Sequence, residues 1–576
     1  MCGILGGTKK DWRYDQAVAA LRHRGPDGAL VVPLESLTLG FARLAIIDLR
    51  PTAMQPMSSS DKSVWIVFNG EIYGFQNLRE DLIRRGHRFH TTSDTEVLLN
   101  AYLEWGDGFM DHLDGMFAIG IYDSRVQKLK LFRDRPGIKP LYYYADGKSF
   151  AFASELKGLT NLCHDVGFDY DDTAVYDYLT YHYIPEPKTF YKNVYKLLPA
   201  HRLTYDISSG TIDSIAPYWR LEPVVHPISL DEACEQLRSL IKESVREQLV
   251  ADVPLGCFLS GGMDSSTIVA EAVQSKKNIE TFSIGFSDEK YSETSYAELV
   301  ARHYQTHHHS KILSNRRAEE LFQSLKTWYD EPFADTSAFP TFLVSEFARQ
   351  RMTVVLSGDG GDEVFGGYTR FKLFEKLSRL PRNSYPGWRN FISGLRKKLP
   401  ANSFLYKALC GIEIIGGDDL ELYGLIMGEF PYQWRKRCAA HWGLRADYDD
   451  YWYFRKHYRK DLPVLTRMQY LDLHTYLPSD ILTKVDRVSM AVSLETRVPF
   501  LSKKIIEFMF SLPEDVRFYG GQLKGLLRET YKDILPEAVL NRRKMGFVIP
   551  FDYFGCSYDQ IQQKILREIF DIPLSA

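Results

Sequence analysis

The sequence has few cysteines, little net charge and no long apolar run. Its seven cysteines form no Cys-x-x-Cys pair, so neither a disulfide framework nor a zinc cluster is indicated, and a reducing compartment is expected. The net charge of -3 argues against nucleic acid as the main partner. No apolar run approaches the ~18 residues of a membrane span, and the N-terminus shows no basic and then apolar leader. We therefore expect a cytoplasmic protein with no membrane partner, acting on small molecules.

The chain is too long for one ordinary hydrophobic core. Its 576 residues predict two or more domains, because single cores stop growing at about 250–300 residues. We place a first domain at residues 1–205, a linker at 206–229, which carries three prolines and little periodicity, and a second domain at 230–576.

The two predicted domains have different patterns. In the first, short apolar runs at 39–48, 63–68, 116–122, 128–132, 141–144 and 149–153 predict strands. Stretches at 76–86 and 95–105 have helical spacing, which predicts sheets covered by helices. In the second, a helix at 230–250, a buried strand at 254–259 and a helix beginning near Thr267 predict a parallel α/β unit. Beyond Tyr368 the pattern is mostly helical.

Cys2 directly follows Met1, and removal of Met1 would place a thiol and a free α-amine on one residue. The amine titrates near pH ~7.7–8 and the thiol near ~8.5, so the amine can take the thiol proton without a histidine. An incidental buried cysteine is the alternative for Cys2 alone.

Other residues of the first domain could complete a site around that thiol. Asn69 and Gly70 end an apolar strand and could present two N–H donors to an oxyanion, although Asn-Gly is also a common turn. Arg43 is a cation in an apolar strand and needs a partner, either a structural carboxylate or a ligand. Asp94 stands at a helix start, where an N-cap role is the simplest explanation.

Together and in this order, these residues resemble the glutaminase domain of class II glutamine amidotransferases. The resemblance continues through residues 133–142 and 153–155. It implies an αββα sandwich of two antiparallel sheets of the Ntn-hydrolase type, in which glutamine is hydrolysed. The implied roles are Cys2 as nucleophile with its α-amine as base, Asn69 and Gly70 as the oxyanion hole, Arg43 for the α-carboxylate of glutamine, and Glu71 and Asp94 for its α-ammonium group, with Asn69 also in the glutamine site.

The second domain contains a Gly-Ser loop, Leu259-Ser-Gly-Gly-Met-Asp-Ser-Ser266, between a buried strand and a helix. Small residues let main-chain N–H groups reach a phosphate, and a helix N-terminus favours an anion. The spacing is not that of a Walker loop. It resembles the pyrophosphate-binding loop of N-type ATP pyrophosphatases, which release AMP and pyrophosphate. Asp264 would then ligate Mg²⁺, with an ordinary N-cap as the alternative.

A second acidic loop follows a β-like run. Asp359, Asp362 and Glu363 lie within five residues and would repel one another unless cations were nearby, which suits a Mg²⁺-ATP site. This loop, together with residues 281–286 and 477–501, resembles the ATP-binding face of glutamine-dependent asparagine synthetases. In that family the signature pair is a cysteine glutaminase fused to an SGGxDSS synthetase, and few sequence combinations are so specific.

The resemblance implies further residue roles in the second domain, with ATP and Mg²⁺ bound. The implied ATP-binding residues are Leu259, Ser260, Gly261, Gly262, Asp264, Ser265, Ser266, Ile284, Ser357 and Gly358. The Mg²⁺ ligands would be Asp264 and Asp362, and the catalytic residues Asp359 and Lys524. Asp480 and Lys484 could also face the cleft.

Two departures from the family pattern leave the acceptor open. Asp359 stands where the best-known members carry glutamate, one methylene longer. Residues 330–337 lack the Thr-Thr and Arg pattern associated with aspartate binding. Elsewhere, His307, His308 and His309 alternate faces of a strand and are interpreted as structural, and Cys234 and Cys257 as inert core residues.

The expected activity is hydrolysis of glutamine and amidation of aspartate through an acyl-AMP intermediate. One alternative amidates another carboxylate, such as a sugar uronate or a biosynthetic intermediate. A β-lactam-forming relative would have no need for Cys2. A catalytically silent scaffold predicts missing catalytic groups, yet Cys2, Asn69, Asp264 and Lys524 are present. The residues alone do not determine the oligomeric state, for which a homodimer is one option.

Overall fold

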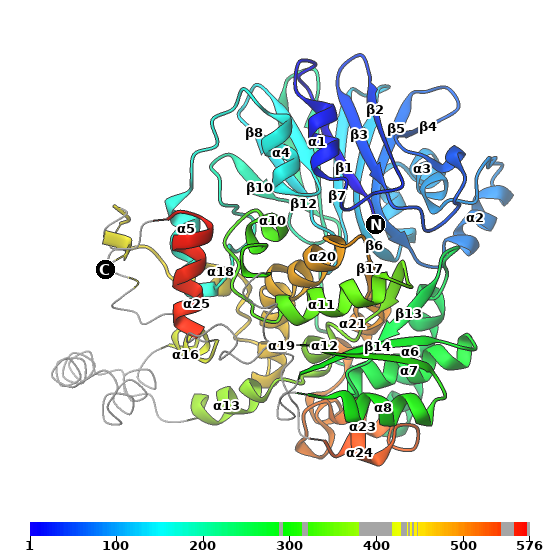
Figure 1. The fold of residues 1–576 in the computed structure, drawn as a ribbon, viewed down its shortest axis with the longest axis vertical. Coiled ribbons are helices and arrows are strands. Elements are labelled where there is room, and N and C mark those ends of the chain that lie inside the picture. Colours follow the sequence, from blue (N-terminus) through cyan, green and yellow to red (C-terminus); the bar gives the residue numbers. More distant parts are fainter. Residues whose placement is uncertain are drawn as a thin grey trace.

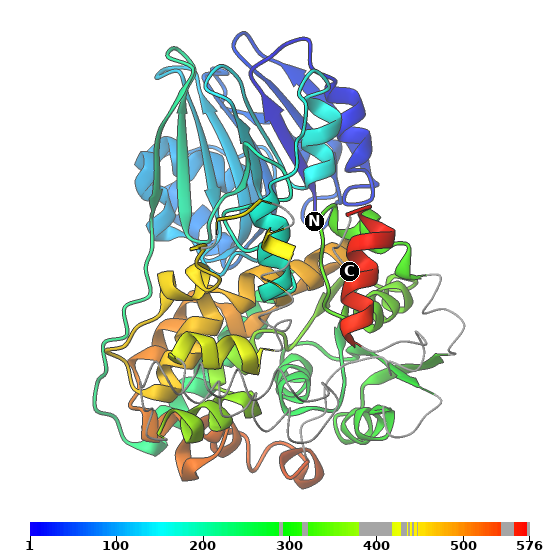
Figure 2. The same cartoon turned by 90° about the vertical axis from the view of Figure 1, so that its left-hand side faces the viewer.

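The computed structural model describes residues 1–286, 292–313, 321–379, 418–427, 435, 438–440, 443–445, 447–542 and 558–572. The first part of the chain, blue to cyan in Figure 1, lies above the second part, which is green to red. The N-terminus lies between the two parts in both Figure 1 and Figure 2. Met1 is accordingly buried and packs with apolar side chains of the second part.

Two antiparallel six-stranded sheets form the centre of the first part. The first has the order β10-β8-β9-β1-β3-β2, and the second β12-β11-β7-β6-β5-β4. The strands of the first sheet are β1 (Gly3–Gly7), β2 (Gly28–Pro33), β3 (Thr38–Arg43), β8 (Tyr142–Ala145), β9 (Phe150–Ala153) and β10 (Val194–Lys196). Those of the second are β4 (Met57–Ser58), β5 (Val64–Ile72), β6 (Gly115–Asp123), β7 (Lys128–Arg133), β11 (His201–Asp206) and β12 (Thr211–Pro217).

Strand alternation produces four layers. Ile4, Phe41 and Val67 pack between the two sheets, while Leu5, the next residue along β1, packs on the opposite face against α1 (Tyr14–Ala20) and α4 (Leu156–Leu162). Phe68 packs against α2 (Phe75–Arg84) and α3 (Asp94–Trp105). Since successive residues of a strand point to opposite faces, each sheet has one side toward its partner and one toward helices. The predicted αββα sandwich is confirmed.

Three element boundaries differ from the sequence-based expectations in ways that matter for the sites. β5 continues to Ile72, so Asn69, Gly70 and Glu71 lie within a strand and not in a turn after it. β3 ends at Arg43, so the expected strand at 39–48 stops early. β12 falls inside the predicted linker and pairs with β11, so the second sheet extends into residues 206–229.

The second part contains a parallel five-stranded sheet of order β15-β14-β13-β16-β17. Its strands are β13 (Leu255–Phe258), β14 (Glu280–Phe286), β15 (His307–Leu313), β16 (Val354–Leu356) and β17 (Glu495–Arg497). Val354 and Leu356 pack on one face and Val355 on the other, as expected for a parallel sheet covered on both sides. β17 was not anticipated, because a mostly helical pattern was expected beyond Tyr368.

Helices surround this sheet and form the extension beyond it. They are α6 (Leu230–Gln248), α7 (Met263–Ser275), α8 (Thr294–His303), α10 (Leu325–Tyr329), α11 (Ala338–Arg349), α12 (Gly361–Phe365), α13 (Thr369–Ser378), α16 (Asp419–Ile426), α18 (Trp452–His457), α19 (Val464–His474), α20 (Thr483–Met490), α21 (Lys503–Ser511), α22 (Glu514–Arg517), α23 (Gly525–Thr530), α24 (Glu537–Leu540) and α25 (Tyr558–Lys564). None of the helices in these described ranges is long and apolar enough to cross a lipid bilayer.

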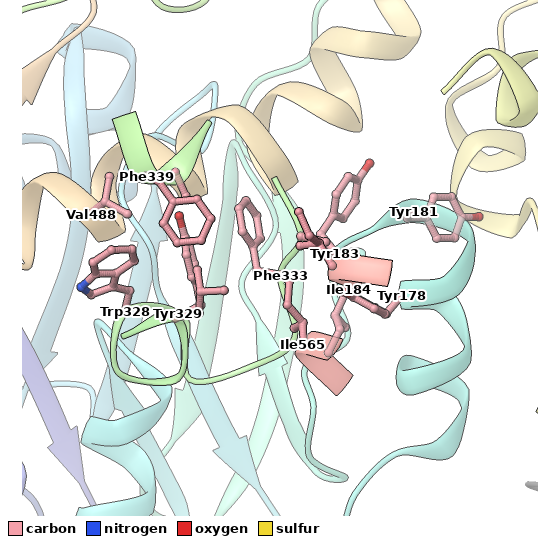
Figure 3. Packing of buried hydrophobic residues seen from close by; sticks show 14 of the residues in the cluster. Tyr178, Tyr181, Tyr183, Ile184, Trp328, Tyr329, Phe333, Phe339, Val488 and Ile565 are labelled. Carbon is pink, nitrogen blue, oxygen red and sulfur yellow. The ribbon is translucent and has the colours of Figure 1, made fainter. Parts of the chain in front are cut away.

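The two parts share apolar clusters across their interface. Tyr178 and Tyr181 of α5 (Asp172–Tyr181) pack in one cluster with Trp328 and Phe339 of the second part. Figure 3 shows Trp328 and Phe339 at one side of the cluster and the two tyrosines at the other, with Phe333 between them. Full burial of each large apolar side chain contributes about 1.5–3 kcal/mol. A rigid arrangement of the two parts is therefore expected.

Candidate functional site

A pocket around Cys2 forms where the ends of several elements meet. Cys2 immediately precedes β1, and β1 pairs with β3, which carries Arg43 at its end. Glu71 comes from β5 and Asp94 from the first turn of α3. The pocket, called the Cys2 pocket below, is lined by Met1, Cys2, Phe41, Arg43, Leu44, Ile46, Ile47, Ala53, Gln55, Phe68, Gly70, Glu71, Ser93, Asp94, Thr95 and Glu495.

Asn69 is held against the main chain of Cys2. The N–H of Cys2 donates to Oδ1 of Asn69 at 2.9 Å, and no described residue accepts a hydrogen bond from the buried Nδ2 of Asn69. With Oδ1 engaged, Nδ2 is available as a donor to an oxyanion. The neighbouring Gly70 cannot carry a side chain, because a Cβ there would lie 2.0 Å from the carbonyl oxygen of Met116.

The Cys2 thiol needs a base. Burial raises its pKa, and its Sγ lies 3.7 Å from the carbonyl oxygen of Leu44. In the chain with Met1 present, the nitrogen of Cys2 is an amide, and the terminal ammonium belongs to Met1, 3.2 Å from Oε2 of Glu495. The lone pair of an amide nitrogen is delocalised into the carbonyl group and does not accept a proton, so this form lacks the base that the sequence predicts.

Arg43 is a buried cation without a carboxylate partner. Its guanidinium donates to the carbonyl oxygens of Arg50, at 2.9 Å, and Asp48, at 2.5 Å, and no acidic side chain in the described ranges pairs with it. The hypothesis that Arg43 forms a structural ion pair is therefore wrong for the part of the chain that the structure describes. A ligand carboxylate would supply the missing negative charge.

Asp94 is not the helix N-cap. The side chain of Ser93 accepts from the N–H of Thr95 and caps α3, which leaves Asp94 to line the pocket. Oδ2 of Asp94 accepts from the N–H of Ile72 at 3.2 Å. Burial raises the pKa of Asp94 to about 7, so its charge changes near neutral pH.

Glu71 is shared between the pocket and a cation of the second part. Its Oε2 accepts from Arg497 at 2.8 Å, while its Oε1 finds no hydrogen-bond partner within the described part of the chain. Burial raises the pKa of Glu71 well above its usual value despite Arg497. A bound ammonium group would satisfy Oε1 and favour the carboxylate.

Glu495 and Arg497 were missed from the sequence. They lie on β17, in the second part, yet Glu495 lines the Cys2 pocket. Burial raises the pKa of Glu495, but the Met1 ammonium, Arg497 and Lys139 lower it below its usual value. Two charged residues in a short buried strand, Glu495 and Arg497, were the available signal, the same signal that singled out Arg43.

The Gly-Ser loop lies at the carboxyl end of β13, next to the acidic loop that follows β16. α7 begins at Met263, earlier than expected, so Asp264 and Ser265 are in its first turn, and Gly262 holds the N-cap position. A Cβ on Gly358 would lie 2.9 Å from the main-chain nitrogen of Ser265, so the two loops touch. Oγ of the buried Ser266 has no partner among the residues that the structure describes.

Lys524 joins the two loops through their carboxylates. It pairs with Asp264 and, at 2.7 Å, with Oδ1 of Asp362. Burial lowers the pKa of Lys524, but the two carboxylates outweigh it and raise the pKa above its usual value. Residues about 260 positions apart in sequence thus form one charged cluster at the carboxyl edge of the sheet, as ligand sites do in parallel α/β folds.

Three of the other predicted nucleotide residues divide into two groups. Ser357 donates to Asp359 at 2.6 Å and so lies in the acidic loop itself. Leu259 and Ile284 are buried in the apolar clusters, where they can form a wall but offer no polar group. No set of three or more His, Cys, Asp or Glu side chains in the described ranges could hold a metal by itself.

A second pocket lies beside the acidic loop and is called the Asp480 pocket. It is lined by Tyr181, His182, Asp335, Arg370, Ile426, Met427, Tyr476 and Asp480. Lys484 connects it to the loop, since Lys484 pairs with Asp335 at 3.1 Å. Burial lowers the pKa of Lys484, but Asp335 and, to a smaller extent, Asp359 of the loop raise it above its usual value. Arg370 gave no local signal in the sequence, whereas Asp480 was anticipated at the cleft. Asp335 lies in the 330–337 stretch, which lacks the expected aspartate-binding pattern.

Arg370 of the pocket pairs with Asp472 at 2.5 Å, but it and Asp480 each keep one polar atom that no described residue engages. Nε of Arg370 and Oδ1 of Asp480 are both buried without a hydrogen-bond partner in the described part of the chain. Burial and the nearby Asp335 raise the pKa of Asp480 well above its usual value. A ligand carrying both an anion and a cation would satisfy both groups.

The residues interpreted as structural do not join either pocket. His307, His308 and His309 alternate along β15, where His308 contacts Thr281 and Ser283. Burial raises the pKa of Cys234 and of Cys257, so their reactive thiolates are disfavoured.

Both parts of the chain match known families. Residues 236–572 match the family described as Asparagine synthase, and residues 1–219 match the Glutamine amidotransferase domain. The chain is 35% identical to asparagine synthetase [glutamine-hydrolyzing] 1 of Bacillus subtilis, over 96% of this chain and 88% of that protein. It is 30% identical to asparagine synthetase [glutamine-hydrolyzing] 3 of the same organism, over 95% and 87%. The Penicillium rubens protein named Amidase chyE is 26% identical, over 95% and 86%.

Proposed function

Because the chain belongs to the family of glutamine-hydrolysing asparagine synthetases, we propose that it transfers the amide nitrogen of glutamine to aspartate at the expense of ATP, forming AMP and pyrophosphate. The observation that carries this proposal is the cluster of Lys524, Asp264 and Asp362. One lysine brings Asp264 of the Gly-Ser loop and Asp362 of the acidic loop together, in the same chain as the Cys2 pocket.

The first half-reaction takes place in the Cys2 pocket. Arg43 holds the α-carboxylate of glutamine, and Glu71 and Asp94 hold its α-ammonium group. After removal of Met1, the amine of Cys2 takes the thiol proton, Sγ attacks the carboxamide carbon, and Nδ2 of Asn69 with the N–H of Gly70 stabilises the oxyanion. The proton passes to the leaving nitrogen, ammonia departs, and water hydrolyses the γ-glutamyl thioester.

The second half-reaction takes place between the two loops. A carboxylate oxygen of the acceptor attacks the α-phosphorus of ATP, and pyrophosphate leaves toward the N–H groups of the Gly-Ser loop and the N-terminus of α7. Lys524 neutralises negative charge on the phosphates. Ammonia then attacks the acyl carbon and AMP departs. Between the two pockets, ammonia would cross an apolar cluster that includes Met116 and Ile138.

Asp264 and Asp362 fit a Mg²⁺ ion that is bound together with the nucleotide. Mg²⁺ is commonly held by one or two carboxylates plus substrate phosphates, not by an all-protein cage. These two carboxylates share one ammonium, that of Lys524, so they already tolerate a cation between them. When bound, Mg²⁺ would neutralise charge on the triphosphate.

We assign the acceptor to the Asp480 pocket. Lys484 links this pocket to Asp359 of the acidic loop, so an acceptor there would lie beside the nucleotide. Arg370 can hold a carboxylate, and Asp480 with Asp335 can hold an ammonium group. This pairing favours aspartate over a sugar uronate, which has no ammonium group.

Product analysis tests the proposal directly. The purified chain is incubated with Mg²⁺, ATP, glutamine and single acids: aspartate, glutamate, succinate and glucuronate. Mass spectrometry then detects AMP, pyrophosphate, ADP and the amide products. Asparagine with AMP is expected from aspartate alone. If AMP forms only with another acid, that acid and not aspartate is the acceptor. ADP without AMP would reject the adenylation chemistry.

A further inference from the structure

Arg497 contacts both candidate sites. Its carbonyl oxygen accepts from the N–H of Ser357, the first residue of the acidic loop, at 2.8 Å. Its guanidinium donates to Oε2 of Glu71, in the Cys2 pocket, also at 2.8 Å. The main chain of one residue is therefore bonded to the nucleotide side, and its side chain to the glutamine side.

The guanidinium of Arg497 has little freedom to move. It is fully buried, and its Nε donates to Glu495 at 2.7 Å. One terminal nitrogen donates to the carbonyl oxygens of Gln248 and Val250, each at 2.7 Å, and the other donates to Glu71. A buried fork with all of these acceptors is held rigidly, because breaking any bond leaves an unsatisfied buried group.

The strand that carries Arg497 is equally constrained. β17 pairs with β16 so that Arg497 lies opposite Leu356, immediately before the acidic loop. Any movement of Ser357 and Gly358 around a nucleotide would therefore be transmitted to β17. Glu495, on the same strand, lines the Cys2 pocket, so both charged residues of β17 reach the glutamine side.

We propose that Arg497 is a positioning residue that couples nucleotide binding to glutamine binding. This inference rests on the proposed function. When a nucleotide repositions Ser357 and Gly358, β17 moves the rigid Arg497 guanidinium with them. The guanidinium then places Oε2 of Glu71 so that Oε1 faces the ammonium group of glutamine. Because binding energies are reciprocal, glutamine must tighten nucleotide binding by the same factor.

A merely structural role for Arg497 makes a different prediction. An arginine that only holds the two parts together would, when changed, alter stability or glutamine affinity equally with and without nucleotide. A coupling residue would alter the ratio of the two affinities. The ratio is therefore the decisive quantity.

The experiment measures glutamine binding at equilibrium in the full chain carrying Cys2→Ala, which prevents turnover. Calorimetry gives the Kd for glutamine alone, and then with Mg²⁺, a non-hydrolysable ATP analogue and aspartate. In this parent protein the ligands are expected to lower the Kd by roughly 5-fold or more, the usual range of allosteric coupling being about 5- to 150-fold. The decisive ratio is the Kd for glutamine alone divided by the Kd with these ligands present. Adding Arg497→Lys should bring this ratio to about one.

Arg133→Lys is the matched control. Arg133 is also buried and donates to four acceptors, namely the carbonyl oxygens of Gly137, Lys139 and Leu197 and the carboxylate of Glu186, but it lines neither pocket. It should keep the parent ratio. In the active enzyme, Arg497→Lys should raise the glutamine KM only when nucleotide and aspartate are present.

The outcomes separate this inference from the proposed function. A parent ratio near one, or an unchanged ratio in Arg497→Lys, overturns the coupling role even if the enzyme makes asparagine. Absence of AMP formation from ATP, aspartate and ammonia overturns the proposed function instead, and with it the premise of coupling. If thermal melting shows that Arg497→Lys is unfolded, Glu495→Gln loosens the same fork and should lower the ratio; an unchanged ratio there would reject the inference.

Discussion

The main-chain N–H of Cys2 donates a hydrogen bond to Oδ1 of Asn69 at 2.9 Å. This bond fixes which end of the Asn69 amide points away from the main chain. The other end, Nδ2, has no acceptor among the described residues, although the side chain is fully buried. A buried donor without a partner is costly, and the oxyanion formed at the Cys2 thiol would satisfy it.

Asn69→Ala should therefore impair the attack on glutamine and spare the second half-reaction. Loss of one oxyanion donor typically lowers kcat by about 10²–10³-fold. The measurement is glutaminase kcat, with ammonia-dependent AMP formation assayed in parallel. Asn100→Ala is the control, since Asn100 bonds the carbonyl oxygen of Arg88 at 3.4 Å and lies outside the pocket. Equal losses in both variants would show that Asn69 is only structural.

Removal of Met1 should decide whether the first half-reaction occurs at all. With Met1 present, the nitrogen of Cys2 is an amide and the Met1 ammonium lies 3.2 Å from Glu495. A chain that retains Met1, or carries an extra residue before Cys2, is expected to lose glutaminase activity and to keep ammonia-dependent synthesis. Intact-mass spectrometry gives the processed fraction. Glutaminase activity that does not follow this fraction would contradict the role of the amine.

Asp94 should make glutamine binding weaker in acid. Burial raises its pKa to about 7, so below that pH the free pocket contains the neutral acid, which cannot pair with an ammonium group. The Kd for glutamine in the Cys2→Ala protein is expected to rise up to tenfold per pH unit as pH falls below about 7. Asp94→Asn should bind weakly at every pH and flatten the profile. A parent profile that is already flat between pH 6 and 8 would exclude Asp94 from the site.

How far the sequence could predict these sites depended on how local their signals are. Cys2, Asn69 and Asp264 lie in short motifs whose neighbouring residues indicate the chemical role. Arg497 lies 426 positions from Glu71, and no local pattern indicates that the two meet. β17 is only three residues long and follows a helical region, so its pairing with β16 depends on tertiary contacts.

The ends of helices and strands were the second feature that the sequence did not predict accurately. The Gly-Ser loop was expected to continue to about Thr267, because Gly and Ser are typical of loops. α7 instead begins at Met263, since Gly262 provides the N-cap position and the small side chains of Ser265 and Ser266 tolerate helical packing. β5 likewise continues through Asn69 and Gly70, because its pairing with β6 extends to Ile72.

Lys524 should be required for adenylation and not for glutaminase activity. Its ammonium lies between Asp264 and Asp362. If a neutral group replaces this buried ammonium, the two carboxylates face each other without a cation between them. Lys524→Met is expected to lower AMP formation by at least about 10²-fold, as for other groups that stabilise transition-state charge. Lys532→Met, at an exposed lysine that pairs with Glu529, is the control. Full AMP formation in Lys524→Met would remove this lysine from the mechanism.

Asp480→Asn should separate acceptor binding from stability. At neutral pH the ionised Asp480 is costly in the free protein, because burial and Asp335 raise its pKa well above the usual value. For such an acid the folded state binds more protons than the unfolded state, so its contribution to the free energy of unfolding falls as pH rises above the unfolded pKa. The amide removes that penalty, so the variant is expected to melt at a higher temperature than the parent at pH 8, with little difference near pH 4.

Asp480→Asn should also raise the KM for aspartate by about 10-fold or more, since a charged hydrogen bond to the ammonium group contributes roughly 1.5–3 kcal/mol. The glutaminase rate should remain intact. Asp447→Asn, at an exposed aspartate paired with Arg445, should change neither quantity. A stabilised Asp480→Asn protein with an unchanged KM for aspartate would move the acceptor out of this pocket.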